Sequence, residues 1–336
     1  MIQIALERPG HFVAIEGPSP SQAPGEALVR VHRIGVCGTD LHAFAGRQPF
    51  FNYPRILGHE LGVEVLDPGS EPNGLNPGDR CSVEPYMNCG RCIACRAGRS
   101  NCCAELKCLG VHVDGGMRPE IVVPARKLHR SRTLAYDQLA LVETLGIGAH
   151  AVDRADITPN DFVLVIGAGP IGLSVCQFVE VRGATLAVMD VSESRLDFCR
   201  RQFASAHTLA AGPDAIDQIR AIGGGDLPTV VMDATGNAAS MAGAFDLPAQ
   251  GGRIVFVGLF QGDVSFNDPN FHRRELTILA SRNAVPGNFT EIIALIESGR
   301  INVDPWMTHR FALADTPDMF PEIAANPDVI KTIIEA

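Results

Sequence analysis

Basic residues are scarce in this chain of 336 residues, which has 28 Lys and Arg against 38 Asp and Glu, for a formal net charge of −10. The sequence pI near 5.5 therefore leaves no general basic surface for phosphates, which argues against nucleic acid and anionic membranes as partners. Apolar residues make up 46% of the chain and charged residues 20%. This composition is typical of a folded chain and excludes a disordered one.

A long hydrophobic run and an export signal are also missing. The longest uncharged stretch runs from Phe162 to Val179, and its glycines and proline would break a membrane-spanning helix in its middle. The first residues, MIQIALERPG, lack a basic segment followed by an apolar one, so no signal peptide is predicted. We therefore expect a cytoplasmic protein.

The length and the rhythm of the sequence predict two domains. Up to about residue 130, short apolar runs alternate with turn clusters such as PSPSQAPG, which is the pattern of a small β-barrel or sandwich. From about residue 160, apolar strands, glycine turns and helical stretches alternate, as in DFVLVIGAGP and PTVVMDATG. This second pattern predicts βαβ units on a parallel sheet, so the fold class is α/β with a doubly wound domain. The segment FTEIIALIESG, from Phe289 to Gly299, is predicted to be a helix.

Eight of the ten cysteines precede residue 110, and without an export signal metal ligation is favoured over disulfides. Four of them follow the spacing Cys89-x2-Cys92-x2-Cys95-x7-Cys103 in a loop with little apolar content, and such a set can wrap one tetrahedral Zn²⁺. The zinc would replace the hydrophobic core that the loop lacks. Disulfides or free thiols are the alternative, and by spacing alone Cys102 serves as well as Cys103.

A second, scattered set consists of Cys37 in GVCGTD, His59 and Glu60 in LGHE, and Glu143 in LVETLG. Taken singly, these residues are explained as a core thiol, a hydrogen-bonded imidazole and a helix-capping carboxylate. Together they offer the mixed ligands of a catalytic zinc with an open position.

The third motif, Gly167-x-Gly169-x-x-Gly172, lies between an apolar strand and an apolar helix, and Asp190 ends the next strand. This context predicts a dinucleotide site in which Asp190 holds the ribose hydroxyls and repels a 2′-phosphate, which favours NAD over NADP. Arg195 and Arg182 keep NADP open, because an arginine can accept that phosphate. The remaining predicted cofactor-binding residues are Pro170, Ile171, Arg195, Val257, Gly258 and Leu259.

The segments GVCGTDLH, LGHE, the four-cysteine lobe, VIGAGPIGL and Asp190 occur in the order of the zinc-dependent medium-chain dehydrogenases, which the whole chain resembles. The resemblance implies a GroES-like catalytic domain at residues 1–150 with a structural zinc lobe at about 85–108, a Rossmann domain at 151–283, and a return to the catalytic domain at 284–336. It implies two Zn²⁺ per chain, selects Cys103 over Cys102, and assigns the catalytic zinc to Cys37, His59, Glu60 and Glu143. Relatives are usually homodimers or homotetramers, so a homo-oligomer is expected.

Glu143 matches the glutamate of the sorbitol- and threonine-dehydrogenase-like branch, although Thr144 stands where that branch usually has proline. Whether Glu60 and Glu143 bind zinc directly or through water is left open. The segments HAFAGRQPFFNYPRILGHE, LGVHVDGG, FNDPNFHRRELT and ASRNAVPGNF resemble bacterial dehydrogenases that oxidise the C5 hydroxyl of six-carbon sugar acids. L-Galactonate and L-gulonate are therefore the leading substrates.

The same resemblance implies that Thr39 and His42 relay the substrate proton, although a turn residue and a surface imidazole are the plain alternatives. A sugar acid also needs a cation for its carboxylate, and a guanidinium suits this role because it can donate two parallel hydrogen bonds. Arg282 in SRNA is the first candidate, with Asn283 for a hydroxyl, and the weaker candidates are Arg47, His272 and Arg273. The rival hypotheses are a neutral-polyol or amino-alcohol dehydrogenase and a catalytically silent binding protein.

Overall fold

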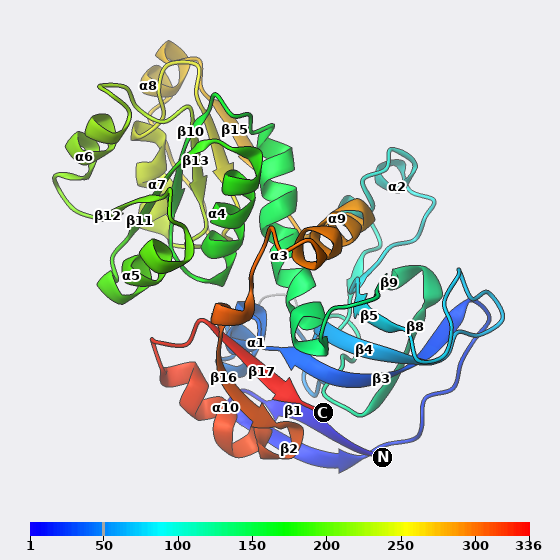
Figure 1. The fold of residues 1–336 in the computed structure, drawn as a ribbon. Helices are drawn as coiled ribbons and strands as arrows, with labels where there is room; N and C mark the ends of the chain where they lie inside the picture. Colours follow the sequence, from blue (N-terminus) through cyan, green and yellow to red (C-terminus); the bar gives the residue numbers. More distant parts are fainter. Residues whose placement is uncertain (49–50) are drawn as a thin grey trace. The chain divides into compact units, whose positions relative to one another are not determined.

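The computed structural model describes residues 1–48 and 51–336, so Pro49 and Phe50 of the QPFF segment lie outside the described residues. The chain forms two compact units (Figure 1), of which unit 1 comprises Met1–Thr144 and Ala284–Ala336 and unit 2 comprises Leu145–Asn283. The first division falls inside helix α3 (Tyr136–Ala155), whereas the division predicted from the sequence follows residue 150. Because this helix continues through both positions, no turn or linker marks the division in the sequence.

Unit 1 is built on a seven-stranded sheet with the order β16-β17-β3-β4-β5-β9, in which β8 also pairs with β3. The strands are β3 (Glu26–Gly35), β4 (Glu60–Asp67), β5 (Arg80–Val83), β8 (Glu120–Pro124), β9 (Leu128–Ser131), β16 (Met307–Ala312) and β17 (Lys331–Glu335). Ala27, Val29 and Val31 alternate with more exposed residues along β3, which is the period-two pattern of a strand with one buried face. Strands from both ends of the chain therefore complete one sheet.

Smaller elements complete unit 1. Two-stranded sheets pair β1 (Ile2–Arg8) with β2 (His11–Glu16), and β6 (Tyr86–Met87) with β7 (Lys107–Cys108). The helices are α1 (Gly38–Phe44), α2 (Ile93–Arg96), α9 (Pro286–Glu297) and α10 (Thr316–Ala325). Helix α9 is the helix that the sequence predicted, and it starts earlier than expected because Pro286 occupies its first turn.

Unit 2 is a parallel six-stranded sheet with the order β12-β11-β10-β13-β14-β15 (Figure 1). Its strands are β10 (Phe162–Ile166), β11 (Thr185–Asp190), β12 (His207–Ala210), β13 (Val230–Asp233), β14 (Arg253–Phe256) and β15 (Thr277–Ala280). Its helices are α4 (Pro170–Arg182), α5 (Glu193–Gln202), α6 (Ala215–Ile222), α7 (Ala238–Gly243) and α8 (Asp268–Arg273). The strand order reverses direction between β10 and β13, and in such sheets ligands bind at the carboxyl ends of the strands at that point.

The apolar stretch from Phe162 to Val179 becomes strand β10, a glycine turn and most of helix α4. Within the described part of the chain, no helix is both long enough and apolar enough to cross a membrane.

Candidate functional site

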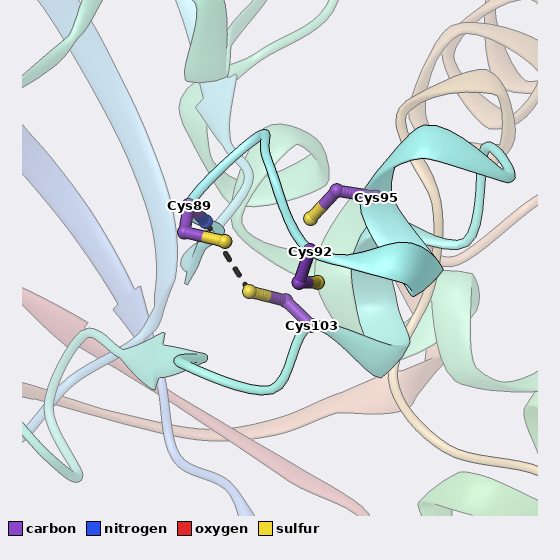
Figure 2. Close-up of side chains that lie close together, drawn as sticks. All are labelled: Cys89, Cys92, Cys95 and Cys103. Carbon is purple, nitrogen blue, oxygen red and sulfur yellow. Dashed lines mark hydrogen bonds between the residues drawn. The ribbon is translucent and has the colours of Figure 1, made fainter.

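The four predicted thiols converge in the lobe between β6 and β7. Figure 2 shows the side chains of Cys89, Cys92, Cys95 and Cys103 pointing toward a common centre, and their sulfur atoms all lie within 4.8 Å of one another. Cys102 is exposed and is not part of this group. The structure thus favours Cys103 as the fourth thiol, as the family resemblance implied.

The surroundings of these thiols suit thiolate ligands of a metal. The backbone N–H of Cys89 donates to Sγ of Cys103 at 3.2 Å (Figure 2), and the side-chain amide of Asn88 donates to Sγ of Cys95 at 3.6 Å. Hydrogen bonds from backbone N–H groups lower the pKa of Cys92 to about 6. Backbone N–H groups also lower the pKa of Cys103, but burial and the neighbouring thiols raise it to about 11 overall. Helix α2 buries no residue, and its Ile93 is 78% exposed. A zinc ion therefore fits as the centre that this coreless lobe otherwise lacks.

A second group of possible metal ligands lies inside unit 1, where the donor atoms of Cys37, His59 and Glu60 all fall within 4.8 Å of one another. Cys37 precedes helix α1, and Glu60 begins strand β4. His59 is 4% exposed and Glu60 is fully buried. Among the described residues, Oε2 of Glu60 is buried without a hydrogen-bond partner. Buried polar atoms normally have partners, and a cation bound by this set would supply one.

Asp40 links two of these three residues and was not among the residues predicted from the sequence. Its Oδ2 accepts the backbone N–H of Cys37 at 2.9 Å, and its Oδ1 lies 3.7 Å from Nδ1 of His59. Burial opposes the positive charge of His59, but Asp40 and Cys37 raise the pKa of His59 well above its ordinary value. A carboxylate behind a ligand histidine orients the ring in many metal sites. The signal was available, because Asp40 directly follows Cys37-Gly-Thr.

Lys331 reaches the same group from the far end of the chain. Its Nζ donates to Oε1 of Glu60 and, at 3.1 Å, to the carbonyl oxygen of Val36. Strand β3 brings the two together, since Gly35 pairs with Glu60 on one side and with Ile333 of β17 on the other. Gly35 also leaves room for the carboxylate, because a Cβ there would lie 2.1 Å from Oε2 of Glu60. No local pattern could have connected Lys331 to Glu60.

Glu143 lies in helix α3 and is 4% exposed, but it is not part of the three-residue group. The hydroxyl of Tyr86 donates to its Oε1. Burial raises the pKa of Glu143 and Glu60 raises it further, whereas His59 lowers it, so the carboxylate interacts electrostatically with the metal set. The helix continues through Thr144 without a break. Direct coordination of zinc by Glu143 stays a prediction. Tyr86 was not among the residues predicted from the sequence.

Thr39 and His42 lie three residues apart on helix α1 and so share one of its faces. Thr39 is half-buried and His42 is exposed. Burial and then the charge of Arg47 lower the pKa of His42, which keeps its imidazole neutral and able to accept a proton near pH 7. Their role in a proton relay stays a prediction.

The glycine motif of unit 2 forms the turn between β10 and α4, and each glycine has its own physical reason. Gly167 adopts a φ of +95°, which other residues rarely accept. Gly169 caps α4, and a Cβ there would meet no atom within 4 Å. At Gly172 a Cβ would lie 1.7 Å from the carbonyl oxygen of Gly167. This pattern of turn, open approach and tight helix packing matches a loop that admits a pyrophosphate, with Pro170 and Ile171 beginning the helix.

Asp190 is fixed beside this loop at the end of β11. Its Oδ2 accepts the backbone N–H of Ala168 at 2.6 Å, and its Oδ1 accepts that of Ser192 at 2.8 Å. Arg195 lies on helix α5, which follows β11. Arg182 ends helix α4 and donates to Asp153 at 2.6 Å, about 20 Å along the helix from the glycine turn. The structure thus places Arg182 away from the predicted ribose site, and the contribution of Arg195 to that site stays a prediction.

Two more sets of predicted residues lie in turns of unit 2. The backbone N–H groups of Val257 and Gly258 both donate to the carbonyl oxygen of Asp233 at 2.9 Å, and Leu259 is 73% exposed. These residues follow β14 at the carboxyl edge of the sheet. The predicted substrate residues follow β15, where Arg282 is exposed and Asn283 is half-buried. Because the metal set belongs to unit 1 and these residues belong to unit 2, their contact with substrate stays a prediction.

The weaker carboxylate candidates are Arg47, His272 and Arg273. Arg47 follows helix α1 in unit 1, and its backbone N–H donates to the carbonyl oxygen of His42 at 2.8 Å. His272 and Arg273 lie in the last turn of α8 in unit 2. All three are exposed, which fits their plain alternative as solvated surface residues.

Two family models match the chain, namely the alcohol dehydrogenase GroES-like domain over residues 23–133 and the zinc-binding dehydrogenase over residues 170–298. The chain belongs to the zinc-binding dehydrogenases. This result confirms the predicted GroES-like plus Rossmann fold class and the assignment as an oxidoreductase that acts on a CH–OH group. Zinc and a nicotinamide dinucleotide, the predicted cofactors, are likewise confirmed at the level of the family.

Individual relatives of this dehydrogenase cover nearly its whole length. The L-galactonate-5-dehydrogenase of Escherichia coli K12 is 38% identical over 98% of this chain and 98% of its own. The D-altritol 5-dehydrogenase of Agrobacterium fabrum is 32% identical over 98% of both chains. Among solved structures, the alcohol dehydrogenase RspB of Escherichia coli CFT073, complexed with NADH, superimposes with a TM-score of 0.91 at 29% identity, covering 100% of this chain and 99% of that one. Sugar-derived alcohols are the common theme of the two named sequence relatives.

Proposed function

We propose that this chain oxidises a secondary hydroxyl of a sugar acid with NAD as hydride acceptor, and that C5 of L-galactonate or L-gulonate is the reacting carbon. The observation that carries the proposal is the buried set of Cys37, His59 and Glu60 in a chain that is 38% identical to an L-galactonate-5-dehydrogenase over nearly its whole length. Sequence similarity of this extent supports the substrate class, and the ligand set supports the chemistry.

Zinc held by this set would supply a Lewis acid that makes the substrate hydroxyl acidic enough to lose its proton. Around it, Asp40 orients His59, while Lys331 holds Glu60 and offsets part of the negative charge of the ligands. In this proposal Thr39 and His42, three residues apart on α1, pass the released proton outward. His42 can accept it because its lowered pKa leaves the imidazole neutral at the working pH.

Unit 2 binds NAD in this proposal, and bound NAD takes up the hydride at its nicotinamide ring. The open backbone at Gly169 admits the pyrophosphate, and Asp190 accepts hydrogen bonds from the ribose. Asp190 also repels a 2′-phosphate, so we expect NAD to be preferred over NADP even though Arg195, on the helix that follows β11, could accept that phosphate. A cytoplasmic location is part of the proposal, because thiolate ligands suit a reducing compartment. The proposal also includes a homo-oligomer, which the resemblance to the dehydrogenase family implies.

A substrate panel tests this function. L-Galactonate, L-gulonate, sorbitol, galactitol and threonine are offered with NAD, and NADH formation is followed by absorbance. We expect turnover of a hexonate and little activity with the neutral polyols or with threonine. The 32% identity to a D-altritol 5-dehydrogenase makes a neutral polyol the second candidate, and fast polyol oxidation with no hexonate turnover would establish it instead.

Arg282→Leu tests the proposed carboxylate contact. A hydrogen bond to a charged group is worth roughly 1.5–3 kcal/mol, so kcat/KM for the hexonate should fall about ten- to a hundredfold, with a higher KM. Neutral polyols should be affected much less. Arg300→Leu is the matched control, since Arg300 is also exposed but belongs to no candidate set. Equal losses on both substrate types would mean that Arg282 supports the cofactor or the fold.

A further inference from the structure

Tyr86 is a buried phenol in unit 1, only 2% exposed, whose hydroxyl donates to Oε1 of Glu143. A phenol hydroxyl beside a carboxylate oxygen, which can only accept, acts as the hydrogen-bond donor. A buried carboxylate oxygen that accepts such a bond is held far more firmly than one that faces water.

The phenol is itself fixed by three neighbouring elements. In the β6–β7 pair, Tyr86 lies opposite Cys108. Its ring packs edge-on against Phe289 of α9, with centroids 6.4 Å apart, and Phe289 stacks on His129 at 4.8 Å. Nε2 of His129 in turn lies 3.2 Å from Oε2 of the buried Glu84. The position of the hydroxyl is thus set by the packing of unit 1, and rotation of the phenol would break its edge-on contact with Phe289.

We propose that Tyr86 is the positioning residue for Glu143, which it fixes through Oε1 so that Oε2 is the oxygen available to a zinc ion at the Cys37, His59 and Glu60 set. This inference rests on the proposed function, because it requires zinc at that set. Glu143 lies outside the compact three-residue group but interacts electrostatically with His59 and Glu60, so the orientation of its carboxylate decides which oxygen a zinc ion would meet. Helix α3 brings the carboxylate near, and Tyr86 selects its orientation.

The test is a double-mutant cycle on the zinc-loaded protein with Tyr86→Phe, Glu143→Ala and both changes together. Zinc release to a chromogenic chelator is followed in time, and the four-cysteine site provides a second phase as internal reference. Tyr86→Phe should speed release of the zinc at the Cys37, His59 and Glu60 set on the order of tenfold. In the Glu143→Ala background the same change should add less than about twofold, because there is no carboxylate left to position.

Tyr136→Phe is the matched control. It removes a phenol hydroxyl in the same unit, from a ring that stacks on His32 at 4.0 Å, and it should leave both release phases unchanged. If Tyr86→Phe does not fold, Phe289→Leu keeps the hydroxyl but loosens its ring support, and it should speed the same phase.

The possible failures are distinguishable. A wild-type protein that holds only one zinc overturns the proposed function and this inference with it. If the wild type holds two zinc ions and Tyr86→Phe leaves their release unchanged, only this inference is overturned. The same holds if Tyr86→Phe speeds release equally in the presence and in the absence of Glu143. An unchanged rate of zinc release in Phe289→Leu would likewise overturn this inference alone.

Discussion

Replacing Gly172 by alanine should destabilise unit 2, because the structure leaves no space for a single methyl group there. The added Cβ would lie 1.7 Å from the carbonyl oxygen and 2.8 Å from the carbonyl carbon of Gly167. Both atoms are backbone, so neither can rotate away, and the turn and helix α4 would have to separate by about 1 Å or more. Overpacking costs about 1–3 kcal/mol, and we expect the upper end of this range.

Gly169→Ala, three residues earlier, is the matched comparison. Gly169 has an ordinary φ of −75°, and a Cβ there would meet nothing within 4 Å. Without cofactor its stability should therefore stay within about 0.5 kcal/mol of wild type. The methyl would instead fill the space in which the pyrophosphate approaches the backbone. Losing one hydrogen bond to a charged group should weaken NADH binding by about tenfold or more.

Two measurements separate these effects. Thermal unfolding without cofactor should show a loss of about 6–12 °C for Gly172→Ala and almost none for Gly169→Ala. NADH fluorescence titration should show weaker binding for both variants. If Gly172→Ala unfolds at the wild-type temperature, the close packing of the turn on the helix is wrong. If Gly169→Ala binds NADH as tightly as wild type, the turn is not the phosphate site.

The remaining predictions concern the ribose contact and the two metal sets. Asp190→Ala should weaken NAD binding and reduce the preference of the enzyme for NAD over NADP. A wild-type enzyme that uses NAD and NADP equally well in steady-state assays would contradict this role of Asp190. Lys331→Met should cost about 3–5 kcal/mol in urea unfolding, because it leaves the buried Glu60 without its cation; an unchanged midpoint would show that the pair is unimportant. Cys92→Ser should lose one zinc per chain by metal analysis, whereas the exposed Cys102→Ser should lose none, and equal metal content in both would overturn the ligand set.

The sequence by itself was enough for the features whose parts are close along the chain. The four thiols from Cys89 to Cys103 fall within one lobe, so their spacing alone limits how they can meet a metal. The same holds for Gly167 to Gly172, because one turn between a strand and a helix contains the whole motif. Alternating apolar runs also predicted the parallel sheet, since burial on both faces leaves continuous hydrophobic strands.

Only the tertiary structure decided how distant residues support one another. Cys37, His59, Glu60 and Glu143 were predicted as one set with the help of family resemblance, and the first three converge in the structure. Lys331 joins them only because β17 pairs with β3, which in turn pairs with β4. Tyr86 of strand β6 and Glu143 of helix α3 are 57 residues apart in the sequence, and they meet only because the fold of unit 1 brings these two elements together. Such pairs are made by chain topology and by the need to satisfy buried polar groups, and neither leaves a local pattern in the sequence.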